Sequence, residues 1–236
     1  MTSLQNTATD DYRPLIPEEQ VATVLELRRV LSGGAPQKEA QTVPFLGLKL
    51  TVPPTVMTPC PVSPILGGAV FAEVREGDRV LDMGTGSGSL ALTAASKGAD
   101  VLAVDINPDA VAAVLANAER NGVADRVEAR VSDVFSTVEG TFDLIVLNPP
   151  FQWFAARDIA DSATTDAGYA TLTRFFRQAR GHLAENGRML IFFSTMGDVA
   201  YLRKLIDDSG LRHEIVFSTT NPVADVPVEF TCHRLS

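Results

Sequence analysis

Apolar and polar positions change their spacing along the chain, and these changes predict alternating strands and helices. From residue 79 onward one unit repeats: a short apolar run, a turn, and a stretch with apolar residues at helical spacing. Runs with almost no polar positions are typical of strands buried on both faces. The alternation predicts a doubly wound, Rossmann-like α/β sheet. Its strands are read as RVLDM (79–83), DVLAVD (100–105), VEARV (127–131), FDLIVL (142–147) and RMLIFFS (188–194).

The helix that follows the second strand has the clearest boundaries. Asn107 is a suitable N-cap, Pro108 occupies the first helical position, and Gly122 ends the segment. The helix after the first strand closes in the same way at Gly98. Near the C-terminus, HEIVFS (213–218) and VPVEFTCHRL (226–235) have strand-like composition and can form a closing antiparallel pair. We therefore expect seven strands with an antiparallel strand at the C-terminal end.

The N-terminal quarter has a different pattern. PEEQVATVLELRRVL begins with proline and acidic residues and has apolar positions at helical spacing, which predicts a helix over 17–31. SGGAP at 32–36 is typical of a linker, and 42–57 reads as two short strands of a hairpin. The expected organisation is a disordered tail (1–16), an N-terminal helix and hairpin (17–60), and a main domain (61–236).

Composition narrows the class of protein. A chain of 236 residues with 45% hydrophobic content suits one large domain with a small appendage. It has no apolar run of membrane-spanning length, its start is polar, and its two cysteines lack metal-ligand spacing. We expect a cytoplasmic protein with no membrane partner and no metal. The net charge of −9 argues against a nucleic-acid partner, because phosphate contacts dominate most nucleic-acid affinity.

A glycine-rich turn follows the first strand of the main domain. The segment 82–88 reads DMGTGSG, and its alternating glycines allow a sharp turn and close backbone approach to a ligand. The helix that follows offers free N–H groups. The spacing departs from the dinucleotide pattern G-x-G-x-x-G, because the third glycine comes one residue early. Ligands of such sheets bind beyond the carboxyl ends of the strands, where this turn lies.

Three carboxylates accompany the turn. Asp105 ends the second strand, about 20 residues after the glycines, where an acid can accept both hydroxyls of a ribose; an acid beside a helix N-cap is the alternative. Asp82 lies within the apolar end of the first strand and needs a partner there, either a ligand ammonium or backbone amides. Asp133 follows the third strand and suits an adenine amino group or a helix cap.

These segments together resemble class I S-adenosylmethionine-dependent methyltransferases over residues 42 to 236. VLDMGTGSG is similar to their glycine motif, AVDIN to their ribose-binding motif, and VSDVF to their adenine-side motif. NPPF (148–151) is similar to the NPPY/F signature of the amino- and amide-methylating branch, which includes HemK/PrmC-type glutamine methyltransferases. The resemblance implies S-adenosylmethionine as cofactor. It also implies these cofactor-binding residues: Asp82, Gly84, Thr85, Gly86, Gly88, Asp105, Ile106, Asp133, Val134 and Asn148.

The NPPF turn has a chemical reading of its own. A planar NH2 group has two donors, which the side-chain oxygen of Asn148 and the carbonyl of Pro149 can each accept. Phe151 can stack on the flat acceptor. Orientation is then the main contribution of the protein to the rate. We expect catalytic roles for Asn148, Pro149, Phe151 and Tyr169. The last belongs to segment 152–169, which is either a substrate lid or a solvated loop.

The chain also departs from the HemK/PrmC pattern. The segment before the glycine motif is Cys-Pro-Val-Ser-Pro (60–64), whereas relatives usually carry basic-Pro-acid-Thr, which counts against a glutamine-peptide substrate. We read Cys60 as a small residue of a pocket wall. Relatives often have a glycine pair where this chain has Asp-Ala-Gly-Tyr (166–169). Three arginines at threefold spacing, at 174, 177 and 180, read as a solvated helix face.

The expected activity is methyl transfer to nitrogen of a small molecule or a protein side-chain amide. One alternative is an adenine N6-methyltransferase acting on RNA or DNA. Another is an enzyme that consumes S-adenosylmethionine itself, as azetidine-2-carboxylate synthases do, with release of methylthioadenosine. A fourth possibility is a non-catalytic cofactor-binding module, against which the intact NPPF argues.

Overall fold

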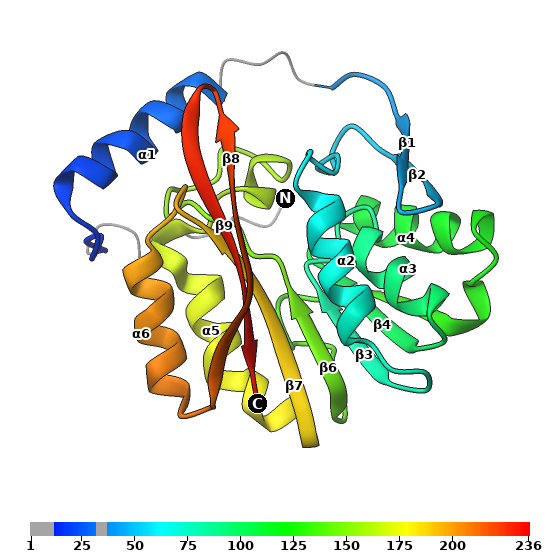
Figure 1. Ribbon diagram of the computed structural model, residues 1–236. Coiled ribbons are helices and arrows are strands. Elements are labelled where there is room, and N and C mark those ends of the chain that lie inside the picture. The colour runs from blue at the N-terminus through cyan, green and yellow to red at the C-terminus, as the bar shows by residue number, and fades with distance from the viewer. Residues whose placement is uncertain (1–11, 32–36) are drawn as a thin grey trace.

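A seven-stranded sheet forms the centre of the computed structural model, which describes residues 12–31 and 37–236 (Figure 1). The strand order is β5-β4-β3-β6-β7-β9-β8; the first five run parallel, and β9 is antiparallel to both of its neighbours. This confirms the predicted fold, including the C-terminal antiparallel pair. The strands are β3 (Arg79–Met83), β4 (Asp100–Asp105), β5 (Val127–Val131), β6 (Phe142–Leu147), β7 (Leu183–Ser194), β8 (His213–Val223) and β9 (Val226–Leu235).

Helices cover both faces of this sheet. In Figure 1, α2, α3 and α4 lie on one side, and α5 and α6 lie on the other. No helix in the described ranges is long and apolar enough to cross a membrane. The α-helices are α1 (Glu18–Leu31), α2 (Ser63–Glu73), α3 (Ser89–Ser96), α4 (Pro108–Arg120), α5 (Ala170–Ala179) and α6 (Val199–Ser209).

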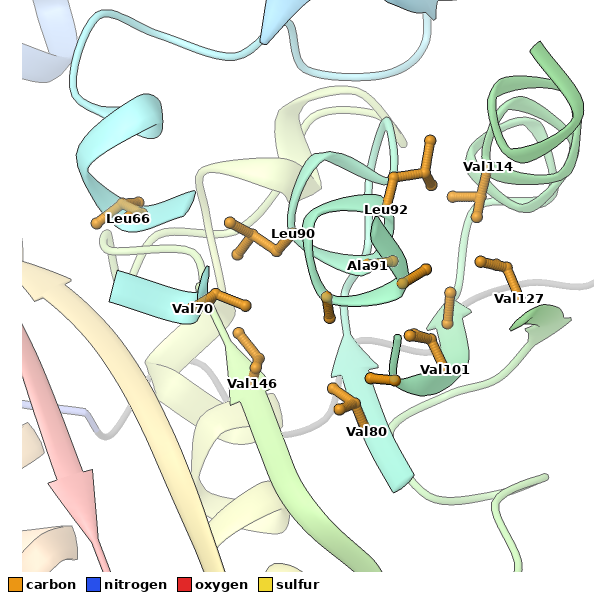
Figure 2. Packing of buried hydrophobic residues seen from close by; sticks show 14 of the residues in the cluster. Leu66, Val70, Val80, Leu90, Ala91, Leu92, Val101, Val114, Val127 and Val146 are labelled. Atoms are coloured by element: carbon orange, nitrogen blue, oxygen red, sulfur yellow. The ribbon is translucent and has the colours of Figure 1, made fainter. Parts of the chain in front are cut away.

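The two faces of the sheet bury alternate residues of the same strands. In β3, Val80 packs with the α2–α3–α4 cluster, and Leu81 packs with the α5–α6 cluster. In β6, Val146 packs with the α2–α3–α4 cluster, and Ile145 packs with the α5–α6 cluster. Figure 2 shows Val80 and Val146 among the helix residues of the first cluster. Successive side chains of a strand point to opposite faces, so strands covered on both sides must be apolar at nearly every position.

The predicted N-terminal hairpin is also present. Strands β1 (Gln41–Phe45) and β2 (Leu48–Val52) pair antiparallel in a sheet of their own. Asn117 of α4 and Asn121, which caps its C-terminal end, hold this hairpin, because their side-chain amides bond to its backbone in both directions. Asn117 accepts from the N–H of Thr51 and donates to its carbonyl, and Asn121 does the same with Lys49. The hairpin therefore packs beside α4 and brings residues 53–60 toward the carboxyl ends of the strands.

Helix α2 was not predicted. Its sequence contains Gly67 and Gly68, which lower helix propensity. Gly67 is required by packing, since a Cβ atom there would lie 2.7–2.9 Å from side-chain atoms of Phe45 and Leu46. The close approach of the hairpin explains why this helix has a weak local signal.

The N-terminal helix is confirmed as α1, which packs Leu27 against Val228 and Phe230 at the far end of the β8–β9 hairpin. Residues 1–11 of the expected tail and the expected linker 32–36 lie outside the described residues. Residues 12–16 contradict the expectation of a disordered tail, because Ile16 is buried and Tyr12 packs among aromatic rings. Long-range contacts with α6 fix this segment, and its own composition does not reveal them.

Candidate functional site

The glycine turn between β3 and α3 forms one wall of a cavity. Gly84, Gly86 and Gly88 have φ values of 70°, 56° and 82°, in the left-handed region that favours glycine. A Cβ atom at Gly84 or Gly86 would meet no heavy atom within 4 Å, so both positions face open space. At Gly88 it would lie 2.9 Å from Leu92 of α3 and 3.0 Å from Val114 of α4, so this glycine lets the two helices pack closely. The first two glycines thus leave room for a ligand against the backbone.

Asp82 is buried beneath this turn. Its Oδ2 accepts hydrogen bonds from Thr85 Oγ1 at 2.7 Å and from the N–H of Ala91 at 3.1 Å. Burial raises the pKa of Asp82 to about 6, although both hydrogen bonds favour the ionised form. From the sequence we expect either a ligand ammonium or backbone amides as the partner of Asp82. The backbone N–H of Ala91, together with the hydroxyl of Thr85, takes that role. Among the described residues the other oxygen, Oδ1, accepts no hydrogen bond. Because Asp82 lines the cavity, Oδ1 remains available to accept one from a ligand.

Asp105 is placed at the end of β4, as predicted. Its Oδ2 accepts from the N–H of Gly86 and its Oδ1 from the N–H of Asn107, both at 2.9 Å. These bonds fix the carboxylate against the glycine turn and against the N-cap of α4. Burial raises the pKa of Asp105, and the backbone bonds oppose that shift. Each oxygen retains a further lone pair, so the fixed carboxylate can still accept from ligand hydroxyls.

The adenine-side residues also border the cavity. Ile106 is 49% exposed and offers an apolar surface to a ligand. Val134 is buried with φ 53°, so the loop after β5 turns sharply into the cavity wall. Asp133 forms a two-armed ion pair with Arg174 of α5, at 2.6 and 2.8 Å. Arg174, Arg177 and Arg180 are all exposed, as expected of a solvated helix face, and the Arg174 guanidinium also orients this carboxylate.

Asn148 directly follows β6 and carries an unsatisfied polar atom. It lines the cavity together with Pro149 and Pro150. Its side-chain Oδ1 is shielded from solvent and has no hydrogen-bond partner among the described residues. A buried acceptor without a donor costs about 1–3 kcal/mol. The amide oxygen and nitrogen have nearly the same shape, so rotation of the amide can present either of them to a ligand.

Phe151 and Tyr169 lie elsewhere than expected. Neither residue lines the cavity. The ring of Phe151 packs edge-on against Phe193 and Phe230, at centroid distances of 5.5 and 6.4 Å. Tyr169 has no exposed surface, so in this arrangement its side chain cannot contact an acceptor. Its hydroxyl donates to the carbonyl of Phe151 instead, which corrects its expected catalytic role.

The middle of segment 152–169 borders the cavity. Gln152 bridges to Thr165, and the N–H of Asp166 bonds back to the carbonyl of Gln152. Between these anchors, Arg157 forms a two-armed ion pair with Asp161. The segment therefore contributes a wall of the site. The members that line the cavity are Ala156, Arg157, Asp158, Ile159, Ser162, Ala163, Thr165 and Asp166.

The cavity has a volume of about 480 Å³, within the range of small-ligand sites. Thr55, Met57 and Pro59, which follow the hairpin, complete its wall; sequence reasoning missed them because they carry no motif. Cys60 is exposed and lies outside this wall, contrary to expectation, whereas the neighbouring Ser63 belongs to it. The described residues contain no cluster of three or more side chains suited to a metal ion.

Comparison with known proteins gives a consistent family match. A family model described as "Methyltransferase small domain" matches residues 69–208, more than half of the chain. A putative protein N5-glutamine methyltransferase of Methanocaldococcus jannaschii is 34% identical over 67% of this chain and 83% of its own length. The crystal structure of a ribosomal protein L11 methylase from Lactobacillus delbrueckii subsp. bulgaricus shares the fold, with TM-score 0.57 and 22% identity, over 77% of this chain and 82% of that one.

Other relatives are longer than this chain. Ribosomal RNA small subunit methyltransferase C of Chromohalobacter salexigens is 41% identical over 49% of this chain, but only 31% of its own length is covered. The chain spans about a third or less of the length of the first curated relatives that it matches. The names of these relatives include both protein and RNA acceptors.

Proposed function

The chain belongs to the methyltransferase small domain family, within the HemK-like branch of class I S-adenosylmethionine-dependent methyltransferases, and we propose that it methylates nitrogen of a small molecule or a protein side-chain amide. Bound S-adenosylmethionine supplies an electrophilic methyl group. The residues present fit this cofactor. Gly84 and Gly86 leave open space at the backbone, and Asp105 presents a fixed carboxylate at the same edge of the sheet.

The acceptor side of the proposal rests on one observation, the unsatisfied oxygen of Asn148 at the cavity. Once rotation of the amide has turned that oxygen toward the cavity, a planar nitrogen with two N–H donors can satisfy it and the carbonyl of Pro149 together. The two prolines fix φ at their positions and so restrict where this carbonyl points. The nitrogen keeps its lone pair for the methyl group when both donors are engaged. The M. jannaschii relative supports an amide acceptor, since its name specifies glutamine N5.

The test follows the methyl group to its acceptor. Purified protein is incubated with methyl-labelled S-adenosylmethionine and, separately, a mixture of glutamine- and asparagine-containing peptides, the small-molecule fraction of a cell extract, and total RNA. We expect mass spectrometry to locate the label on an amide or amino nitrogen of a peptide or small molecule. Labelling of RNA alone would overturn the proposal. Release of methylthioadenosine without any acceptor would also overturn it, because the cofactor itself would then be consumed.

Two variants sharpen this experiment. Asn148→Ala should retain cofactor affinity within a few-fold and lose turnover by about a hundredfold, because misorientation near the reacting atoms is costly in rate. Asn186→Ala is the matched control, since Asn186 is an exposed asparagine in the N-terminal half of β7. The proposal requires a large difference in turnover between these two variants.

A further inference from the structure

A buried hydroxyl lies directly behind the NPPF turn. Tyr169 Oη donates to the carbonyl of Phe151 at 2.5 Å and accepts from the N–H of Asp198 at 2.7 Å. The carbonyl of Phe151 has no other hydrogen-bond donor among the described residues. Tyr169 itself has φ 54°, a conformation that costs energy for a residue with a side chain. The surrounding structure therefore holds this hydroxyl at the turn against backbone strain.

The turn needs a partner from outside its own backbone. Pro149 and Pro150 have no N–H groups, so neither can donate a hydrogen bond that would hold the turn. The next backbone hydrogen bond along the chain runs from the N–H of Gln152 to the carbonyl of Thr164. Both residues belong to segment 152–169, beyond the NPPF turn. Tyr169 thus provides the first fixed point after the two prolines.

Gly197 shows how closely this region is packed. A Cβ atom there would lie 2.0 Å from the carbonyl oxygen of Phe151 and 2.8 Å from Tyr169 Oη. Its φ lies outside the left-handed region, so backbone conformation does not explain the glycine. A side chain of any size at this position must displace the turn or the hydroxyl that holds it.

Asp198 extends the arrangement to the N-terminal segment. Its carboxylate has no exposed surface; Oδ1 accepts from the N–H of Tyr201 at the start of α6. Its Oδ2 accepts from Tyr12 Oη at 2.7 Å and from the N–H of Leu15 at 2.5 Å. A buried carboxylate needs such donors, so residues 12–15 stabilise the position of Asp198 and, through its N–H, that of Tyr169.

We propose that Tyr169 is a positioning residue for methyl transfer, held by Asp198 and the docked segment 12–15, and that it fixes the NPPF turn through the carbonyl of Phe151. The proposal rests on the proposed function, because the turn matters only if it orients an acceptor. It assigns to Tyr169 an action through the backbone, with no contact between its side chain and the substrate.

The test compares hydroxyl deletions within one aromatic cluster. Tyr169→Phe removes the group that bonds to the turn. Tyr201→Phe is the matched control, because the Tyr201 ring stacks on Tyr169 at 5.2 Å while its hydroxyl pairs with Thr173. Methyl transfer to the peptide mixture, calorimetric affinity for S-adenosylmethionine, and acrylamide quenching of Trp153 are measured for each. Trp153 is the only tryptophan of the chain, and its ring lies 6.3 Å from that of Tyr169.

We expect Tyr169→Phe to lower kcat about tenfold with cofactor affinity within about threefold of the parent. Quenching of Trp153 should rise roughly twofold, because the turn opens locally. Gly197→Ala should change the same quantities in the same direction, and Tyr201→Phe should resemble the parent in all three.

Two results would overturn the proposal: parental quenching and kcat in Tyr169→Phe, or equal losses in Tyr169→Phe and Tyr201→Phe. The quenching measurement needs no acceptor, so it decides whether Tyr169 holds the turn even if the parent labels no peptide. Failure of the parent to label any peptide or small molecule would instead count against the proposed function.

Discussion

The buried carboxylate of Asp82 predicts a measurable pH dependence of folding stability. Its pKa is about 6 in the folded protein, above the ordinary value of 3.8 expected in the unfolded chain. The folded state therefore holds the proton more tightly. The resulting stabilisation is fully present below pH 3.8 and is lost as the pH rises through 6. The difference in pKa, at about 1.36 kcal/mol per pH unit, corresponds to about 3 kcal/mol.

Asp82→Asn isolates this contribution. The amide oxygen of asparagine can still accept from Thr85 and Ala91, but the side chain no longer titrates. Urea unfolding of parent and variant without cofactor, at several pH values from 4 to 7.5, gives the free energy of unfolding of each. Because the unfolded chain is already partly ionised at pH 4, we expect the parent to lose roughly 2 kcal/mol relative to the variant across this range.

The comparison cancels the titration of groups that do not interact with Asp82. The charge of Asp105, whose pKa is also raised by burial, repels that of Asp82, so this repulsion is part of the measured difference. Asp125→Asn serves as a control, because Asp125 is an exposed carboxylate outside the cavity wall, and its curve should run parallel to that of the parent. Parallel curves for the parent and Asp82→Asn would refute the reasoning, since they would show that Asp82 ionises alike in folded and unfolded chains.

Three further predictions concern ligands and the glycine turn. Asp105→Ala should weaken S-adenosylmethionine binding about tenfold or more, because hydrogen bonds to a charged group contribute roughly 1.5–3 kcal/mol each; unchanged calorimetric affinity would contradict this. Gly86→Ala should lower the free energy of unfolding by about 1 kcal/mol, because φ is 56° there, and an unchanged urea midpoint would contradict that. Duplex DNA and structured RNA should bind weakly at physiological salt, given the net charge of −9; submicromolar affinity falling steeply with added salt would revive the nucleic-acid alternative.

The strands, the glycine turn and the helix cap could be predicted because their signals are local. A strand buried on both faces must be apolar almost throughout, as in 142–147, whatever packs against it. Gly84 and Gly86 are required by positive φ values within a single turn. Asn107 caps its helix by accepting from the N–H of Asp109, only two residues away. Each of these requirements can be read from a few neighbouring residues.

Long-range packing explains what could not be predicted. Gly67 weakens the local signal of α2, and the hairpin that requires it precedes it by about 20 residues in the chain. Tyr169 lies three residues after the cavity-lining Asp166, in a segment where an aromatic residue suggests a lid. Contacts with Tyr201 of α6 and with Asp198, the N-cap of α6, bury it completely. Tyr12 belongs to a polar stretch, and only long-range contacts make it part of the fold: its bond to Asp198, 186 residues away, and its packing on Tyr169 and Tyr201.

The two sides of the cavity have different structural origins, which bears on the acceptor. The cofactor side lies at the carboxyl ends of the sheet strands. The wall beyond Asn148 comes from residues 55–59 and 156–166, both in connecting segments. Connecting segments tolerate change better than buried strands and carry much of the specificity of binding sites. Relatives can therefore share the cofactor side while acting on protein or RNA, and exchange of 156–166 with a relative should change acceptor choice more than cofactor affinity.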